Sequence, residues 1–285
     1  MSNVFIPRFI GSLDSVEKAD IVVAGFPYDC TSSFRAGSRF APREIRSYSF
    51  EAIEDFSFYF GRGLDEIKFF DAGDMDVMVG NPSLMTEEIR KTALELMENG
   101  KKLLGIGGEH LVTYPLFQAH QELYGNFTIL HLDAHADLRE GYAGDSLSHA
   151  SVMNLCLQEG LEKLIQFGIR SGTREEYNMR QTDERIIPAE SIEEIADAIE
   201  VGEKIYISLD VDFFDSGLFP GTGTPETGGH TFLEYIRILK VLREKRCNII
   251  GADILEFFPE VDPSKCSTVF AAKLVRETLL AIGLQ

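Results

Sequence analysis

The stretch FTILHLDAHAD, residues 127–137, decides the fold, because an almost entirely apolar run leads directly into a cluster of charged residues. Its first part, Phe127–Leu132, is typical of a parallel strand that is covered on both faces. The stretch KIYISLD, Lys204–Asp210, has the same character and also ends on an acidic residue. Both stretches therefore predict strands in the interior of a mostly parallel sheet.

Similar apolar runs alternate with helical stretches along the rest of the chain. Further strands are predicted at Ile21–Gly25, Ile67–Asp71, Lys102–Ile106, Leu164–Ile169 and Ile249–Leu255. Helices are predicted at Thr86–Asn99 and at Thr268–Ile282, the latter ending before Gly283. Two more are predicted to begin after Ser191 and after Thr231, because these residues have capping-box spacing to Glu194 and Glu234. This strand–helix–strand repetition implies right-handed crossovers and a mostly parallel sheet. Because no linker or repeat interrupts it, we expect one α/β domain over residues 1–285.

Composition narrows the class of protein and its partners. The chain has 285 residues, 44% of them hydrophobic, which is enough to bury a core, and a net charge of −19. Such an acidic chain excludes nucleic acid as a partner, since phosphate binding needs a positive surface. The charge is compatible with a cationic substrate, although acidic charge also simply keeps proteins soluble.

The cysteines and the hydropathy pattern bear on the compartment. The four cysteines form no Cys-x-x-Cys pair, so they indicate reduced thiols rather than a zinc or redox site. The segment Met1–Ser15 lacks the basic opening and apolar run of a leader, and no stretch approaches the ~18 apolar residues of a membrane helix. We therefore expect a cytoplasmic protein that does not bind membranes.

The chemistry is expected where strands end, because ligands of such sheets bind beyond the carboxyl ends of the strands. Three predicted strands end in Gly107-Gly108-Glu109-His110, Asp133-Ala134-His135-Ala136-Asp137 and Asp210-Val211-Asp212. Residues two apart on an extended backbone point the same way, so the side chains of each motif can converge. Four buried carboxylates would repel one another unless cations neutralised them. We therefore expect two divalent cations about 3.5–4 Å apart, held by His110, Asp133, His135, Asp137, Asp210 and Asp212.

The type of ligand also limits the metal. Carboxylates with some imidazole and no thiolate suit manganese, magnesium or iron better than a structural zinc.

Of the two glycine-rich stretches, Gly107-Gly108 lacks the spacing of a phosphate loop and predicts a tight turn. The stretch Gly221–Gly229 follows Asp212 and either is a plain surface loop or forms a wall of the site.

These motifs resemble the ureohydrolase (arginase/agmatinase) family, and within it the agmatinases most. The resemblance runs over nearly the whole chain and rests on the stretches GFPYDCTSSFRAGSRFAP (25–42), GIGGEH (105–110), HLDAHADLRE (131–140), SHAS (148–151), SLDVDFFD (208–215), PGTGTPETGG (220–229) and DILEFFP (253–259). It implies a single three-layer α/β domain around an eight-stranded parallel sheet, with two Mn(II) ions per subunit on the six ligands named above. It adds two catalytic residues that the pattern of residues alone does not single out: His149 as a proton shuttle and Glu256 as the carboxylate for a guanidinium group.

The resemblance implies hydrolysis of a guanidino substrate, agmatine giving putrescine and urea, by a hydroxide that bridges the two metals. Asp137 would accept a hydrogen bond from this hydroxide and help to move its proton. The family also implies a homo-oligomer, a trimer or hexamer. The chain departs from the family pattern at Ala36, Ser216 and His230, which affects loop geometry but removes no ligand.

Other activities remain open at this point. Arginine, guanidinobutyrate or an aminopropylated agmatine could replace agmatine, and Arg139 or Arg174 could pair with a substrate carboxylate. A non-catalytic relative that kept the fold and the metals is a further alternative. A deacetylase of the same fold is disfavoured, since such enzymes use a single zinc and lack the Asp133–Asp137 cluster.

Overall fold

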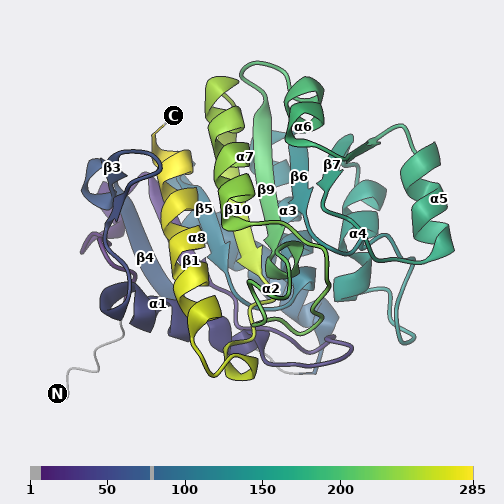
Figure 1. The fold of residues 1–285 in the computed structure, drawn as a ribbon, viewed down its shortest axis with the longest axis horizontal. Coiled ribbons are helices and arrows are strands. Elements are labelled where there is room, and N and C mark those ends of the chain that lie inside the picture. The colour runs from purple at the N-terminus through teal and green to yellow at the C-terminus, as the bar shows by residue number, and fades with distance from the viewer. Residues whose placement is uncertain (1–7, 78–79, 285) are drawn as a thin grey trace.

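A sheet of eight strands lies in the middle of the molecule, and every pair of neighbouring strands in it is parallel (Figure 1). The computed structural model describes residues 8–77 and 80–284. Across the sheet the order is β4 (Phe69–Asp74), β1 (Ile21–Gly25), β5 (Lys102–Ile106), β10 (Asn248–Leu255), β9 (Lys204–Asp210), β6 (Thr128–Leu132), β7 (Lys163–Phe167) and β8 (Ile186–Ala189). A separate antiparallel pair joins β2 (Phe56–Ser57) to β3 (Arg62–Gly63). The single α/β domain with an eight-stranded parallel sheet is confirmed.

Helices cover both faces of this sheet, which gives three layers. One hydrophobic core joins the sheet to α1 (Ala41–Glu51), α6 (Ile192–Ala198), α7 (Phe232–Glu244) and α8 (Cys266–Gly283). A second core joins the opposite face to α2 (Pro82–Leu96), α3 (Thr113–Tyr124) and α4 (Val152–Gln158), while α5 (Arg174–Thr182) packs against β8. Strand β1 shows why: Ile21 and Val23 belong to the first core and Val22 and Ala24 to the second. A strand buried on both faces needs apolar residues at every position.

The structure corrects several predicted boundaries. Strand β8 was not predicted, because its sequence IIPA is short and contains Pro188, which is tolerated at the edge of the sheet, where β8 lies. Strand β4 begins at Phe69 and continues to Asp74, beyond the predicted Ile67–Asp71. Helix α2 starts at Pro82 rather than Thr86, since the Asn81 side chain caps it by accepting from the N–H of Leu84.

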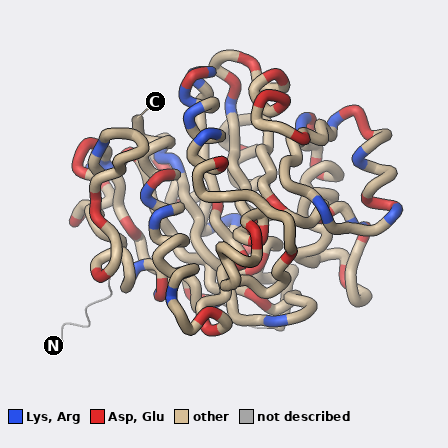
Figure 2. Tube along the Cα trace, in the orientation of Figure 1, with Lys and Arg blue, Asp and Glu red and all other residues tan. Residues whose placement is uncertain are grey.

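Acidic and basic residues are interspersed along the whole trace (Figure 2). The net charge of −19 therefore does not by itself mark a site. Within residues 8–77 and 80–284, no helix has both the length and the apolar character needed to cross a membrane.

Candidate metal centre and active site

Four neighbouring strands in the middle of the sheet position the candidate site. In the order β5, β10, β9 and β6, they end at Ile106, Leu255, Asp210 and Leu132. Their carboxyl ends thus deliver residues from four separate parts of the sequence to one edge, as expected for this sheet type. After β5, Gly107 and Gly108 make the predicted tight turn with positive φ angles of 76° and 83°. A side chain at Gly108 would collide with the carbonyl oxygen of Phe26, 2.3 Å from the position of its Cβ.

His110 faces three of the carboxylates. Its Nδ1 lies 3.0 Å from Oδ2 of both Asp133 and Asp137, and 3.6 Å from Oδ2 of Asp210. This Nδ1 makes no hydrogen bond, although it is buried. A ring nitrogen aimed between carboxylates without a hydrogen bond is well placed to bind a cation.

A second group lies beside the first. Nδ1 of His135 is 2.9 Å from Oδ2 of Asp212 and 3.7 Å from Oδ1 of Asp133. Asp133 thus belongs to both groups of side chains that could hold a metal ion: one with His110, His131 and Asp137, the other with His135 and Asp212. A shared carboxylate between two sets of donors fits two neighbouring cations.

The electrostatics of the cluster also favour cations. Burial and the nearby Asp133 carboxylate raise the pKa of Asp137 to about 6. Burial and Asp212 raise the pKa of Asp210, and burial and Asp133 raise that of Asp212. Buried carboxylates of this kind are unstable as free anions, and two divalent cations would balance four of them. The donor set of carboxylates and imidazoles suits manganese, magnesium or iron.

The Ser208 hydroxyl and the Asp253 carboxylate determine which ring nitrogen of His110 carries the lone pair. The Ser208 hydroxyl donates to Oδ1 of Asp253 over 3.0 Å and lies 2.9 Å from Nε2 of His110. Because its hydrogen is used for Asp253, Ser208 accepts from Nε2–H of His110, which leaves the lone pair on Nδ1. Asp253 is buried and also accepts from the hydroxyls of Thr113 and Tyr206 at 2.9 and 2.7 Å.

His131 supports Asp133 from behind, a role that the sequence did not reveal. Its Nε2 lies 2.8 Å from Oδ2 of Asp133, and the Gln166 amide lies 3.0 Å from its Nδ1. The amide oxygen of Gln166 accepts from Arg180, so the amide nitrogen is the group that donates to His131. The remaining hydrogen of His131 is therefore on Nε2, directed at Asp133.

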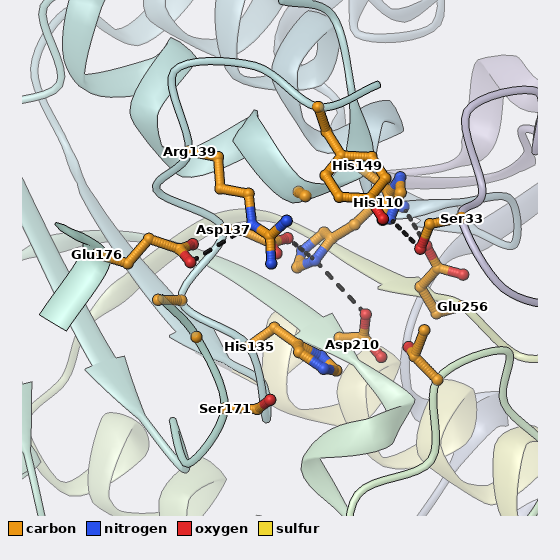
Figure 3. Close-up of a pocket in the computed structure, with 15 residues that line it drawn as sticks. Ser33, His110, His135, Asp137, Arg139, His149, Ser171, Glu176, Asp210 and Glu256 are labelled. Carbon is orange, nitrogen blue, oxygen red and sulfur yellow. Dashed lines mark hydrogen bonds and ion pairs between the residues drawn. The ribbon is translucent and has the colours of Figure 1, made fainter. Parts of the chain in front are cut away.

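A cavity of about 190 Å³ opens over this cluster and contains the two residues implied by the resemblance (Figure 3). His149 lies on one wall and its Nε2 is 3.2 Å from Oγ of Ser33. Glu256, which follows β10, is 7% exposed. Thr224 also lines the cavity and donates to Oδ2 of Asp212 over 3.0 Å, so the stretch Gly221–Gly229 does form part of the wall.

Asp137 and Glu256 share an unusual backbone conformation. Their φ angles are 51° and 63°, in the left-handed region that residues with a side chain rarely adopt. Such strain costs of order 1–3 kcal/mol per residue and is concentrated at functional sites. The sequence gives no signal for it, because both residues follow apolar strands like any other strand-end acid.

Comparison with known proteins agrees with this geometry. The sequence profile of the arginase family matches residues 19–281. The chain belongs to the arginase family. It is 39% identical to the agmatinase of Halalkalibacterium halodurans, with 95% of each chain covered, and 36% identical to the N(1)-aminopropylagmatine ureohydrolase of Thermus thermophilus, with 94% and 92% covered. The solved agmatine ureohydrolase of Thermoplasma volcanium superposes with a TM-score of 0.85 at 28% identity, covering 99% of this chain and 96% of that one.

For this arginase-family chain, the structure brings all six predicted ligands to one edge of the sheet and places His149 and Glu256 in the cavity above them. Their roles stay predictions. Sequence reasoning missed Ser33 and Tyr142, which also line the cavity. Ser33 lies within the family-like segment 25–42, which was the one available signal.

Proposed function

We propose that this chain hydrolyses agmatine to putrescine and urea with two Mn(II) ions per subunit. The observation that carries the proposal is the placement of Glu256 and His149 in the cavity over the His/Asp cluster. Four agmatinases of 37–40% identity, each covering 95% of this chain, support agmatine as the substrate.

Glu256 is the group that would bind the guanidinium. Its Oε1 accepts a hydrogen bond of 2.9 Å from the backbone N–H of His110, which fixes the carboxylate over the cluster. A carboxylate held in this way can accept paired N–H donors from a planar guanidinium, which sets the direction from which water attacks the central carbon.

The candidate ligands are His110, Asp133, His135, Asp137, Asp210 and Asp212. Two divalent cations bound there would supply Lewis acidity, which would lower the pKa of a water molecule from its ordinary value toward neutral pH. Asp137 would accept a hydrogen bond from the attacking water. When the bond between carbon and the alkyl nitrogen breaks, His149 would deliver a proton to the departing amine, since a primary amine leaves readily only when it is protonated.

The outer part of the cavity bears on the choice of substrate. Arg139 lines it, and its Nε lies 3.5 Å from Oε2 of Glu176 (Figure 3). Because Glu176 offsets its charge, the distal ammonium of agmatine can lie near Arg139 without strong repulsion. A longer cationic tail would extend toward solvent, and relatives that act on N(1)-aminopropylagmatine make this the second candidate substrate.

The decisive experiment is a urea-release assay with Mn(II) on agmatine, aminopropylagmatine, 4-guanidinobutyrate and arginine. The highest kcat/KM is expected for agmatine. If another of the four compounds has the highest kcat/KM, that compound rather than agmatine is the substrate. If none of the four releases urea, the chain is a non-catalytic metal-binding relative. Metal analysis should give two ions per chain.

The wider setting follows from the same proposal. Putrescine production places the chain in polyamine metabolism, and its four cysteines, all free thiols, are compatible with the cytoplasm. The resemblance to the family leads us to propose a homo-oligomer, a trimer or hexamer, which sedimentation analysis would test.

A further inference from the structure

A buried carboxylate outside the metal cluster connects to His149 through one hydroxyl. Glu109 is fully buried, with 0% exposure, and follows the glycine turn after β5. Its Oε2 accepts from the backbone N–H of Thr31 at 2.8 Å and from the hydroxyl of Ser32 at 3.1 Å. Its Oε1 accepts from the hydroxyl of Thr31 at 2.7 Å.

The hydroxyl of Thr31 has only one hydrogen, and Glu109 receives it. Toward His149 the same oxygen can therefore only accept. It accepts from the backbone N–H of His149 at 3.0 Å and lies 3.3 Å from its ring Nδ1. Oγ of Ser148, which accepts from the backbone N–H of Ala150, lies farther from the same nitrogen, at 3.4 Å. The closer oxygen, that of Thr31, can only accept, and this favours a hydrogen on Nδ1.

The other ring nitrogen faces the cavity. Nε2 of His149 is 3.2 Å from Oγ of Ser33, which can donate to it (Figure 3). Burial lowers the pKa of His149 to about 4, so the ring is neutral near pH 7 and carries one ring hydrogen. Which nitrogen carries it decides which nitrogen can take up a proton.

We propose that Thr31 and Glu109 are positioning residues that hold His149 in the tautomer with hydrogen on Nδ1, so that Nε2 alone exchanges protons in the cavity. The functional consequence rests on the role proposed above for His149. In each turnover Nε2 would accept a proton released by the attacking water and return it to the nitrogen of the departing amine. Nδ1–H would stay in place, directed at the Thr31 hydroxyl, whose own hydrogen Glu109 accepts.

The tautomer can be measured directly on protein with ¹⁵N-labelled histidine. The chain has six histidines, and the signal of His149 is assigned by its loss in His149→Gln. We expect Nδ1 to show the shift of a protonated nitrogen and Nε2 that of an unprotonated one. In Thr31→Val, which keeps the shape but loses the hydroxyl, the Nε2–H form should appear. Thr31→Ser restores the hydroxyl and should restore the wild-type spectrum.

Kinetics provide the second measurement. Thr31→Val should lower kcat by about 10-fold, a part of the roughly 10²–10⁴-fold that general acid–base catalysis contributes. KM and metal content should change little, and Thr31→Ser should recover most of the loss. Ser32→Ala is the matched control for the spectrum, because it removes a donor to the same carboxylate but does not contact the ring. Glu109→Gln should also disturb the tautomer, since an amide has only one oxygen for three donors.

Two results would overturn the inference. The first is an Nε2–H tautomer in the wild-type protein, and the second is a Thr31→Val protein whose tautomer and kcat both equal those of wild type. A wild-type protein with the expected tautomer but no urea release from any guanidino compound would instead refute the proposed function and leave the positioning role standing.

Discussion

The backbone N–H of His110 donates a hydrogen bond of 2.9 Å to Oε1 of Glu256, so the proposed metal site and the proposed guanidinium site hold each other in position. The two residues are 146 positions apart and follow the adjacent strands β5 and β10. Glu256 keeps this position in spite of its left-handed backbone, with φ of 63°. The proposed binding of cations and the proposed binding of substrate therefore depend on one shared contact.

Glu256→Gln separates these two effects. Its amide oxygen can still accept from His110, whereas the negative charge for the guanidinium is lost. We expect metal content near the wild-type value and a fall in kcat/KM of at least about 100-fold, roughly 2.7 kcal/mol, because charge-assisted pairs are about twice as strong as neutral ones. Urea release and metal analysis on the same sample check this. Loss of metal together with activity would show that the carboxylate charge supports the metal site instead.

Removal of cations should destabilise the protein, because ions that bind only the folded state stabilise it. A chelator should lower the melting temperature, and Mn(II) should restore it. Asp253→Asn should raise the Mn(II) concentration needed for half-recovery by about 10–100-fold, the usual cost of losing support behind a ligand. Asp253 acts through Ser208 on His110, with both distances at or below 3.0 Å.

Tyr206→Phe is the control for that experiment. It removes one of the hydroxyls that donate to Asp253 but leaves Ser208 and His110 untouched. Its Mn(II) requirement should therefore lie near that of the wild type. An equal shift in both variants would mean that general packing, rather than the orientation of His110, determines the affinity.

The sequence predicted the central strands and the acidic cluster for one reason: each candidate ligand ends an apolar strand or lies within five residues after one. It could not predict β8, whose four residues include Pro188. Nor could it predict that Asp137 and Glu256 adopt left-handed backbones, because nothing local favours that conformation in an acid.

The supporting contacts were also beyond sequence reasoning, because they join residues far apart in the chain. Glu109 and Thr31 are 78 positions apart, and Gln166 and His131 are 35 apart. Gln166 lies inside β7, where a polar side chain would be taken as facing solvent, yet it is fully buried. Which polar residue is buried depends on the neighbouring strand, and that is known only from the sheet order.

We expect His120 to make the folded protein less stable in mild acid. It is fully buried on α3, and burial lowers its pKa from 6.5 to about 4. The unfolded chain therefore binds a proton below pH 6.5 that the folded chain binds only near pH 4. The free energy of unfolding is therefore unaffected by protonation of His120 above pH 6.5, and it falls by about 3 kcal/mol as the pH falls to 4.

His120→Gln tests this, since glutamine does not titrate. Urea denaturation of both proteins at pH 7 and pH 4.5, with chelator present to remove the effect of metal release, should show a smaller acid loss in the variant. Equal losses in the two proteins would show that His120 does not contribute to the acid sensitivity.

Arg139 should decide between cationic and anionic substrate tails. It lies on the cavity wall between Glu176 and Tyr142, with its guanidinium 4.9 Å from the centre of the Tyr142 ring. Arg139→Gln removes a positive charge from the path of the distal group. We expect the ratio of kcat/KM for agmatine to that for 4-guanidinobutyrate to rise by about 3–5-fold, since a partly exposed charge contributes up to about 1 kcal/mol.

Arg174→Gln is the matched control, because Arg174 begins α5 on the surface and does not line this cavity. Its ratio should remain at the wild-type value, and the effect of Arg139→Gln should shrink in high salt, as a charge effect must. If the ratio is unchanged in Arg139→Gln, or changes equally in both variants, the distal end of the substrate is not sensed by the charge of Arg139. The same substrate pair would then be used to examine Glu226, another partly exposed charge beside the cluster, whose Oε1 lies 3.6 Å from Nε2 of His135.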